Sequence, residues 1–150
     1  MRIIVISDTH QYYRNFETIV LRNPDADMFL HLGDGESEYQ LLCRNMPEVA
    51  DKFRYVKGNC DYGSDAPLTE LIDVAPNHRI LATHGHRYRV NSTLDYLEQE
   101  ALENGCDVAL YGHTHESRCT YENGIYVMNP GSASCPRDCL LYTSDAADDL

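Results

Sequence analysis

Residues 2–10 read Arg-Ile-Ile-Val-Ile-Ser-Asp-Thr-His, an apolar run that passes directly into a polar turn. An uninterrupted apolar run of this length predicts a short strand buried on both faces, as in a parallel sheet. Asp8 and His10 follow the carboxyl end of that strand, which is where open α/β sheets bind their ligands. The same combination of an apolar strand and a metal-competent side chain recurs four more times along the chain.

The four recurrences follow the expected strands at residues 28–32, 53–57, 79–83 and 108–111. In chain order they are Gly33-Asp34-Gly35, Gly58-Asn59-Cys60-Asp61, His84-Gly85-His86 and Gly112-His113-Thr114-His115. Carboxylate oxygens and imidazole nitrogens suit Mn²⁺, Fe²⁺, Zn²⁺ or Ni²⁺ rather than Ca²⁺, and no thiolate ligand is implied. A single Gly-Asp usually marks a turn, and a single Asp-x-His is common. The five motifs together favour a metal site over packing.

The spacing within these motifs carries further expectations. Alternate side chains of an extended segment share one side, so the two members of Asp-x-His and of His-x-His are expected to reach one site. The glycines at positions 33, 58, 85 and 112 are expected to let the backbone approach the cluster closely. His31 and His78 are expected to be structural or exposed, and His86 to lie behind the ligands or to face the substrate.

The remaining pattern predicts an α/β fold in one domain. Apolar residues at helical spacing predict two helices in residues 13–22 and 39–46, the second stopped by Pro47. With the strands, they give a β-α-β-α-β order that favours a parallel sheet covered by helices. Turns at Pro76-Asn77 and Asn123-Gly124 predict hairpins. A capping box at Ser92-x-x-Asp95 predicts a helix that ends before Gly105.

Composition limits the possible partners and compartments. The chain has 150 residues and a formal net charge of −12, which argues against a nucleic-acid polymer or an anionic membrane as partner. No apolar run approaches the ~20 residues of a membrane span, and no signal peptide is evident, so a cytoplasmic location is expected. The six cysteines form no CxxC pair and are expected to be reduced, with Cys43, Cys106 and Cys119 in the core.

The ordered motifs, followed by Asn129-Pro130-Gly131-Ser132, resemble those of the calcineurin-like metallophosphoesterases. The small size and the segment Gly58-Asn59-Cys60-Asp61 are similar to the YfcE-type phosphodiesterase branch of that family. The resemblance covers about residues 1–138. It implies an αββα sandwich with two divalent metal ions at the strand ends, Mn²⁺ first, with Ni²⁺, Zn²⁺, Fe²⁺ and Mg²⁺ as alternatives.

The resemblance also implies a role for each site residue. Asp8, His10 and His115 would hold the first metal, Asn59, His84 and His113 the second, and Asp34 would bridge the two. Asn59, Cys60 and His113 would be the catalytic residues. The implied mechanism is attack on phosphorus, in line, by a hydroxide held between two ions ~3.5–4 Å apart.

Cys60 departs from the wider superfamily, where a histidine in this place is thought to assist the leaving group. A thiol hydrogen-bonds weakly and its unperturbed pKa is ~8.5, so good leaving groups are expected. The alternative, that Cys60 only packs, stays open.

Three functions are compatible with the residues. The first is a metal-dependent phosphodiesterase acting on small substrates. The second is a phosphomonoesterase or nucleotide pyrophosphatase with the same two metals, because specificity lies in loops around the site. The third is a scaffold like the retromer subunit related to this family, which predicts substitutions among the ligands; none occurs here. A homo-oligomer is compatible with each.

The last residues do not follow the pattern. Residues 139–148 read Cys-Leu-Leu-Tyr-Thr-Ser-Asp-Ala-Ala-Asp, which is what a transposon-end sequencing adapter encodes in one frame. Residues 139–150 are therefore expected to be adapter read-through. The domain is expected to span 1–138 and to lack a C-terminal strand that would otherwise help complete a sheet, leaving a sheet edge exposed.

Overall fold

The computed structural model describes residues 1–74 and 76–137, so the expected read-through tail lies outside the described residues. Strands and helices alternate in its first half, and strands predominate in its second. The elements are β1 (Ile3–Ile6), α1 (Tyr13–Leu21), β2 (Met28–His31), α2 (Glu36–Asn45), α3 (Pro47–Ala50), β3 (Phe53–Tyr55), β4 (Thr69–Val74), β5 (His78–Thr83), the 3₁₀ turn η1 (His86–Tyr88), α4 (Asp95–Glu103), β6 (Val108–Leu110), β7 (Ser117–Glu122) and β8 (Ile125–Pro130).

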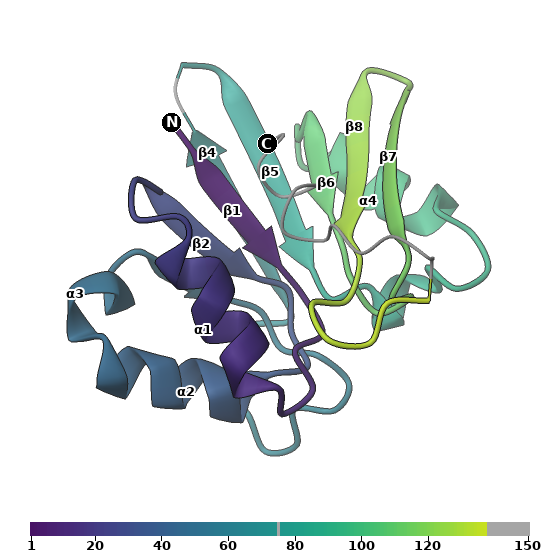
Figure 1. Ribbon diagram of the computed structural model, residues 1–150. Helices are drawn as coiled ribbons and strands as arrows, with labels where there is room; N and C mark the ends of the chain where they lie inside the picture. The colour runs from purple at the N-terminus through teal and green to yellow at the C-terminus, as the bar shows by residue number, and fades with distance from the viewer. Residues whose placement is uncertain (75, 138–150) are drawn as a thin grey trace.

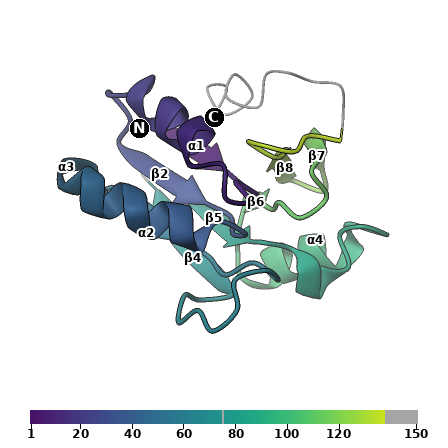
Figure 2. The ribbon, with the colours of Figure 1, turned by 60° about the horizontal axis from the view of Figure 1, so that its bottom comes forward.

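Two sheets pack face to face between helices (Figures 1 and 2). The first sheet has the order β1-β2-β3, and all of its strands are parallel. The second has the order β4-β5-β6-β8-β7, with hairpins β4–β5 and β7–β8 at its two edges. Helices α1 to α3 cover the outer face of the first sheet, and α4 covers that of the second. The expected αββα sandwich and both expected hairpins are confirmed.

Three apolar layers hold the sandwich together. Phe16 and Leu42 bring α1 and α2 onto Phe29 of the first sheet. Between the sheets, Val5 and Leu30 pack in one cluster with residues of β4 to β6. On the far side, residues of α4 pack on those of β5, β6 and β8. The central strands are therefore buried on both faces, which explains their continuous apolar runs.

The parallel pairing brings the polar turns together. Strands β1, β2 and β3 run in one direction in the first sheet, and β6 lies parallel to β5 in the second, with Ile80 opposite Val108. The carboxyl ends of neighbouring parallel strands meet at one edge of each sheet. The two edges come together where the His113 amide donates to Asp8 Oδ2 at 3.0 Å, so the turns after β1, β2, β3, β5 and β6 meet there. No helix in the described ranges 1–74 and 76–137 is long and apolar enough to cross a membrane.

The second helix ends at Asn45, so the prediction that it stops at Pro47 is confirmed, and Pro47 then begins α3, where the first turn needs no amide proton. Two local predictions were wrong. The α4 cap is Leu94 rather than Ser92, and the Asp95 amide bonds the Thr93 hydroxyl at 3.2 Å. Cys119 is exposed because β7 is an edge strand with little cover, whereas Cys43 is half-buried and Cys106 buried. The five cysteines of the described residues are free, as expected.

His31 is structural, in agreement with the sequence. It is fully buried on β2, stacked on Tyr55 and edge-on to Phe16. The Gly33 amide donates to His31 Nδ1 at 3.1 Å, so Nε2 carries the proton that faces Thr9 Oγ1 at 3.1 Å. Burial lowers the pKa of His31 to about 4. The ring is therefore neutral at ordinary pH.

This burial predicts a pH dependence of stability. The pKa of His31 is lower in the folded chain than in the unfolded chain. The stability that the neutral His31 ring contributes to the folded chain is therefore complete above about pH 6.5 and is lost as the pH falls towards 4. We expect wild type, freed of metal, to lose roughly 3 kcal/mol more unfolding free energy over this range than His31→Phe. At neutral pH the variant should be about 1–3 kcal/mol less stable, because Thr9 and Gly33 lose a partner. Urea unfolding of both proteins at several pH values measures the pH dependence and the difference at neutral pH. If the unfolding free energies of wild type and His31→Phe ran parallel with pH, His31 would not be the residue responsible.

Candidate metal centre

Asp8, His10 and His115 form the first group of converging side chains. His10 Nε2 and His115 Nε2 lie 3.5 and 3.3 Å from Asp8 Oδ1, and 3.0 Å from each other. Asp8 is fully buried, whereas the two imidazoles are half-buried at the surface of the site. The three ligand atoms are therefore close enough to hold one ion.

Asn59, His84 and His113 form the second group. Asn59 Oδ1 lies 2.9 Å from His84 Nε2 and 3.0 Å from His113 Nδ1, and the two ring nitrogens are 3.3 Å apart. All three atoms can present a lone pair to the same point. This convergence is typical of atoms that share a ligand.

Asp34 lies between the two groups. Its Oδ2 is 3.3 Å from His84 Nε2 and 3.8 Å from His10 Nε2, so it contacts one imidazole of each group. His84 Nε2 also lies 3.8 Å from Asp8 Oδ1. The structure thus brings together all seven residues that the sequence singled out as ligands.

The backbone achieves this convergence in a way that the sequence argument did not foresee. Asp8 and His10 have φ values of 56° and 40°, and His113 and His115 have values of 68° and 62°. These motifs are not extended segments, so the alternation argument was wrong, although Asp8, His10, His113 and His115 all lie in the cluster. Asp34 is left-handed as well, with φ at 60°. Such conformations cost of order 1–3 kcal/mol each and concentrate at functional sites.

Two imidazoles are held with one nitrogen facing the cluster. His84 Nδ1 donates to the Leu32 carbonyl at 2.7 Å, and His115 Nδ1 donates to the Cys135 carbonyl at 2.9 Å. In each ring the bond fixes the Nδ1–H form and leaves Nε2 directed at the cluster. Metal-ligating histidines almost always make this second bond.

The charges in the cluster fit a bound cation. Burial opposes the ionisation of Asp8, but the imidazoles of His10 and His115 and the charge of His84 outweigh it and hold the pKa of that carboxyl well below its usual value. The pKa of Asp34 is also lowered, chiefly by His84 against the effect of burial. Asp8 Oδ1 is nevertheless buried without a hydrogen bond. A buried, ionised and unpartnered oxygen facing imidazole nitrogens matches the donor set of a transition-metal ion.

Two glycines let the backbone approach the carboxylates. A Cβ on Gly58 would lie 2.1 Å from Asp34 Oδ1, and a Cβ on Gly112 would lie 2.8 Å from Asp8 Oδ2. A side chain at Gly58 would displace Asp34, and one at Gly112 would displace Ser7 first and crowd Asp8. Gly85 differs from expectation, since a Cβ there would meet Val90 rather than the cluster.

Asp61 organises the turns that carry the ligands, a role that the sequence did not reveal. Its carboxylate accepts from the amides of Asp34 at 2.9 Å and Gly58 at 2.8 Å, and from the Tyr55 hydroxyl at 2.7 Å. It also accepts from the first amides of α2, those of Gly35 and Glu36. One buried side chain thus joins the turns after β2 and β3. The Gly-Asn-x-Asp motif was the only sequence signal for it.

The end of β8 and the loop that follows it join two other ligand turns. Ser132 Oγ, in the loop, donates to the Asp8 carbonyl at 2.7 Å, and Asn129 Nδ2, near the end of β8, donates to the Gly112 carbonyl at 3.0 Å. This segment therefore links the turn after β1 to the turn after β6. Asn129 and Ser132 belong to the Asn-Pro-Gly-Ser motif, to which the sequence had assigned no role.

Cys60 and His86 lie beside the cluster. Cys60 is exposed, and its Sγ falls in one group with ligand atoms of His10 and Asp34. Burial and the Asp34 charge raise the pKa of Cys60 to about 11, so it is a thiol at neutral pH. The centroid of the His86 ring lies 5.5 Å from that of the His84 ring and 6.2 Å from that of the His113 ring. It is therefore half-buried beside two of the proposed ligands.

Comparisons with known proteins agree with this geometry. Residues 1–144 match the family model described as the calcineurin-like phosphoesterase superfamily domain. The chain is 34% identical to YsnB of Bacillus subtilis, named a probable metallophosphoesterase, over 91% of this chain and 78% of that protein. It is also 34% identical to the phosphodiesterase YfcE of Escherichia coli, over 64% of this chain and 52% of that protein.

Two solved structures extend the comparison. A predicted phosphoesterase from Streptococcus pneumoniae superposes with a TM-score of 0.77 at 32% identity, over 92% of this chain and 76% of that chain. Vps29 from Entamoeba histolytica, solved in complex with Zn²⁺, superposes with a TM-score of 0.72 at 26% identity, over 94% and 79%. The first of these proteins is named a predicted phosphoesterase, and the second is a Vps29, a name that stands for vacuolar protein sorting 29.

The contacts of Asp61 predict that Asp61→Asn weakens both the fold and metal binding. The amide keeps one acceptor oxygen but places an NH₂ group against backbone N–H donors. We expect the unfolding free energy to fall by about 2–4 kcal/mol and the affinity for Mn²⁺ to fall roughly 10–100-fold. Denaturant unfolding and calorimetric titration measure the two effects. Asp51→Asn, at an exposed carboxylate after α3, is the matched control and should change stability by no more than about 0.5 kcal/mol. If Asp61→Asn and Asp51→Asn changed the stability and the Mn²⁺ affinity equally, Asp61 would not organise the ligand turns.

Proposed function

We propose that this chain, which belongs to the calcineurin-like phosphoesterase superfamily, is a metal-dependent phosphodiesterase acting on small substrates. Membership of this superfamily, and the likeness to relatives named metallophosphoesterase and phosphodiesterase, identify the chain as a phosphoric ester hydrolase. The observation that supports a working metal site best is the convergence of seven ligand residues in two groups joined by Asp34, with Asp8 Oδ1 buried and without a hydrogen bond. The diester preference rests on the likeness to YfcE and on Cys60.

The proposed ligand assignment follows the two groups. Asp8, His10 and His115 would hold one ion, Asn59, His84 and His113 a second, and Asp34 would contact both. The mixed oxygen and nitrogen donors support a transition-metal ion, with Mn²⁺ proposed first. When bound, divalent cations supply Lewis acidity, charge for the phosphate and a water of lowered pKa. We also propose a cytoplasmic location, which the free cysteines of the described residues support.

Hydrolysis of a phosphodiester adds one water. A new bond forms from phosphorus to the water oxygen, the bond to one ester oxygen breaks, and the products are a phosphomonoester, an alcohol and one proton. The chain's part is to fix the geometry of this exchange. Asn59 lies between His113 and Cys60. Its Oδ1 is 3.0 Å from His113 Nδ1, and its Nδ2 is 3.5 Å from Cys60 Sγ. These three residues, proposed as catalytic, therefore form one continuous wall of the site.

Cys60 would face the departing oxygen from this wall. Its amide donates to Asp34 Oδ1 at 2.8 Å, which fixes the thiol beside the cluster. A thiol donates only a weak hydrogen bond, so it gives little help to a basic alkoxide. Substrates with acidic leaving groups should therefore be hydrolysed fastest.

A scaffold function, as in the Vps29 likeness, is the second candidate. It explains the fold equally well, but it does not require seven intact ligands or the strained backbone that aims them. A phosphomonoesterase would use the same ligands and differs only in the surrounding loops.

The function is tested with Mn²⁺-loaded protein on bis-p-nitrophenyl phosphate and p-nitrophenyl phosphate. We expect faster turnover of the diester, loss of activity in EDTA, and a drop in kcat of at least roughly 100-fold in His113→Ala. His78→Ala removes a histidine that is exposed on β5 and should retain full activity. Absence of turnover with any divalent metal would favour the scaffold, and preference for the monoester would favour the phosphomonoesterase.

The weak hydrogen bond that the Cys60 thiol can donate predicts the effect of Cys60→His. An imidazole can donate a stronger hydrogen bond to the departing oxygen, so kcat should rise on diesters with alkyl leaving groups and change little on nitrophenyl esters. The gain should be on the order of tenfold or more. A folded, metal-loaded variant with unchanged or lower kcat on alkyl esters would show that Cys60 only packs.

A further inference from the structure

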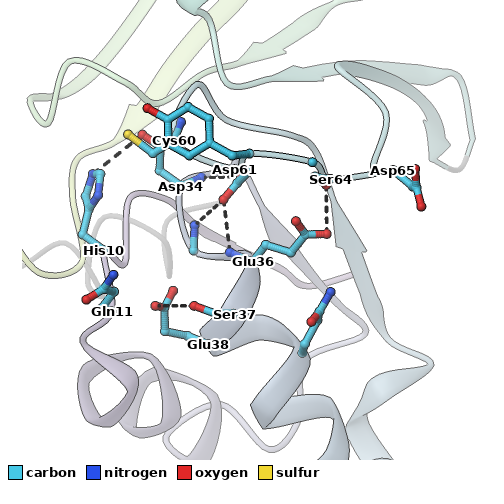
Figure 3. Close-up of a pocket in the computed structure, with 14 residues that line it drawn as sticks. His10, Gln11, Asp34, Glu36, Ser37, Glu38, Cys60, Asp61, Ser64 and Asp65 are labelled. Atoms are coloured by element: carbon cyan, nitrogen blue, oxygen red, sulfur yellow. Dashed lines mark hydrogen bonds and ion pairs between the residues drawn. The ribbon is translucent and has the colours of Figure 1, made fainter.

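A cavity of about 610 Å³ opens directly from the metal centre. Figure 3 shows His10, Asp34 and Cys60 grouped at one end and Ser64 and Asp65 at the other. The first turn of α2 forms one wall, and the loop 61–65 forms the opposite wall. A phosphate held at the cluster would therefore extend one of its ester substituents into this space.

The cavity is strongly acidic. Five of its 14 lining residues are carboxylates, and none of the 14 is lysine or arginine. Three of these carboxylates already have partners: Asp34 lies in the cluster, Asp61 binds backbone amides, and Glu38 accepts from Thr9 and Ser37. The nearby Lys57 ammonium is directed at the Ser64 carbonyl at 3.4 Å and does not line the cavity.

Glu36 and Asp65 remain with uncompensated charge. Glu36 Oε1 accepts one neutral hydrogen bond, from Ser64 Oγ at 2.8 Å, and Asp65 is exposed at the outer end. Neither forms an ion pair with any residue in the described part of the chain. A second anionic group on a substrate would be repelled here, whereas a cation would be attracted.

An aromatic ring completes the lining. Tyr62 belongs to the same loop and its side chain is 89% exposed, so the ring is available to a ligand. Carboxylates together with an open aromatic face are the groups that bind ammonium and quaternary ammonium ions. Neutral polyols would gain only hydrogen bonds from the same lining.

We propose that this cavity is a substrate subsite that binds a cationic ester substituent, so that the preferred substrates are zwitterionic phosphodiesters bearing an ammonium or quaternary ammonium group. Glu36, Asp65 and Tyr62 determine this specificity without touching the reacting atoms. The inference rests on the proposed phosphodiesterase function and names the class of substrate for it.

A matched pair of substrates tests the proposal. p-Nitrophenyl phosphocholine carries a quaternary ammonium, and p-nitrophenyl 3,3-dimethylbutyl phosphate replaces that nitrogen with carbon at nearly the same shape. With Mn²⁺-loaded protein we expect kcat/KM for the choline ester to exceed that for the neutral ester on the order of tenfold at low ionic strength. The ratio should fall as salt is added.

Variants locate the effect in the cavity. The double variant Glu36→Gln/Asp65→Asn should bring the ratio of kcat/KM for the choline ester to kcat/KM for the neutral ester close to one. Hydrolysis of the neutral ester should persist, because neither change reaches the cluster. Tyr62→Ala should lower the ratio partly. Glu103→Gln/Glu122→Gln removes two exposed carboxylates of α4 and β7, and so matches the loss of net charge away from the cavity. This control should keep the wild-type ratio.

The outcomes separate the two proposals. Hydrolysis of both esters at equal kcat/KM would overturn the subsite and leave the phosphodiesterase function standing. A ratio lowered equally by the control would show that overall charge, not the cavity, is responsible, and would also overturn the subsite. Hydrolysis of neither ester would overturn the phosphodiesterase function and, with it, the inference that depends on it.

Discussion

Asp8 and Asp34 place two ionised carboxylates side by side in the interior, and much of the structure serves to make that arrangement tolerable. Burial alone would favour their neutral forms, and each charge disfavours the other. The imidazoles of His10, His84 and His115 supply part of the compensation, yet Asp8 Oδ1 keeps no hydrogen bond. A site built in this way is complete only with cations, which ties its stability and its chemistry to the same ions.

The fold meets this requirement through the direction of its strands. Parallel pairing within each sheet, together with the packing of the two sheets, brings five strand ends together, and each end supplies at least one ligand. Positive φ angles then turn the side chains inward, at a cost in backbone energy that the surrounding contacts must offset. Asp61 fixes the turns after β2 and β3, and Ser132 fixes the turn after β1. The cluster is therefore held by side chains that do not themselves belong to it.

Much of this could be predicted from the sequence, because apolar periodicity and strand-end motifs are local signals. The α/β class, the hairpins and the meeting of polar strand ends followed from them, whereas the sandwich and the set of seven ligands were implied by the resemblance to a known family. What could not be predicted depends on contacts between distant segments. The left-handed φ of His113 arises from the turn's tertiary setting, the exposure of Cys119 from the edge position of β7, and the role of Asp61 from amides of another turn. The acidic cavity likewise exists only because the loop 61–65 folds back over α2.

We propose that the seven residues form a site for two cations. Anomalous diffraction from crystals of the Mn²⁺-loaded protein locates these ions. We expect two manganese peaks, one bonded to Asp8, His10 and His115 and the other to Asn59, His84 and His113, with Asp34 bonded to both. A single peak, or manganese bound away from these side chains, would contradict it.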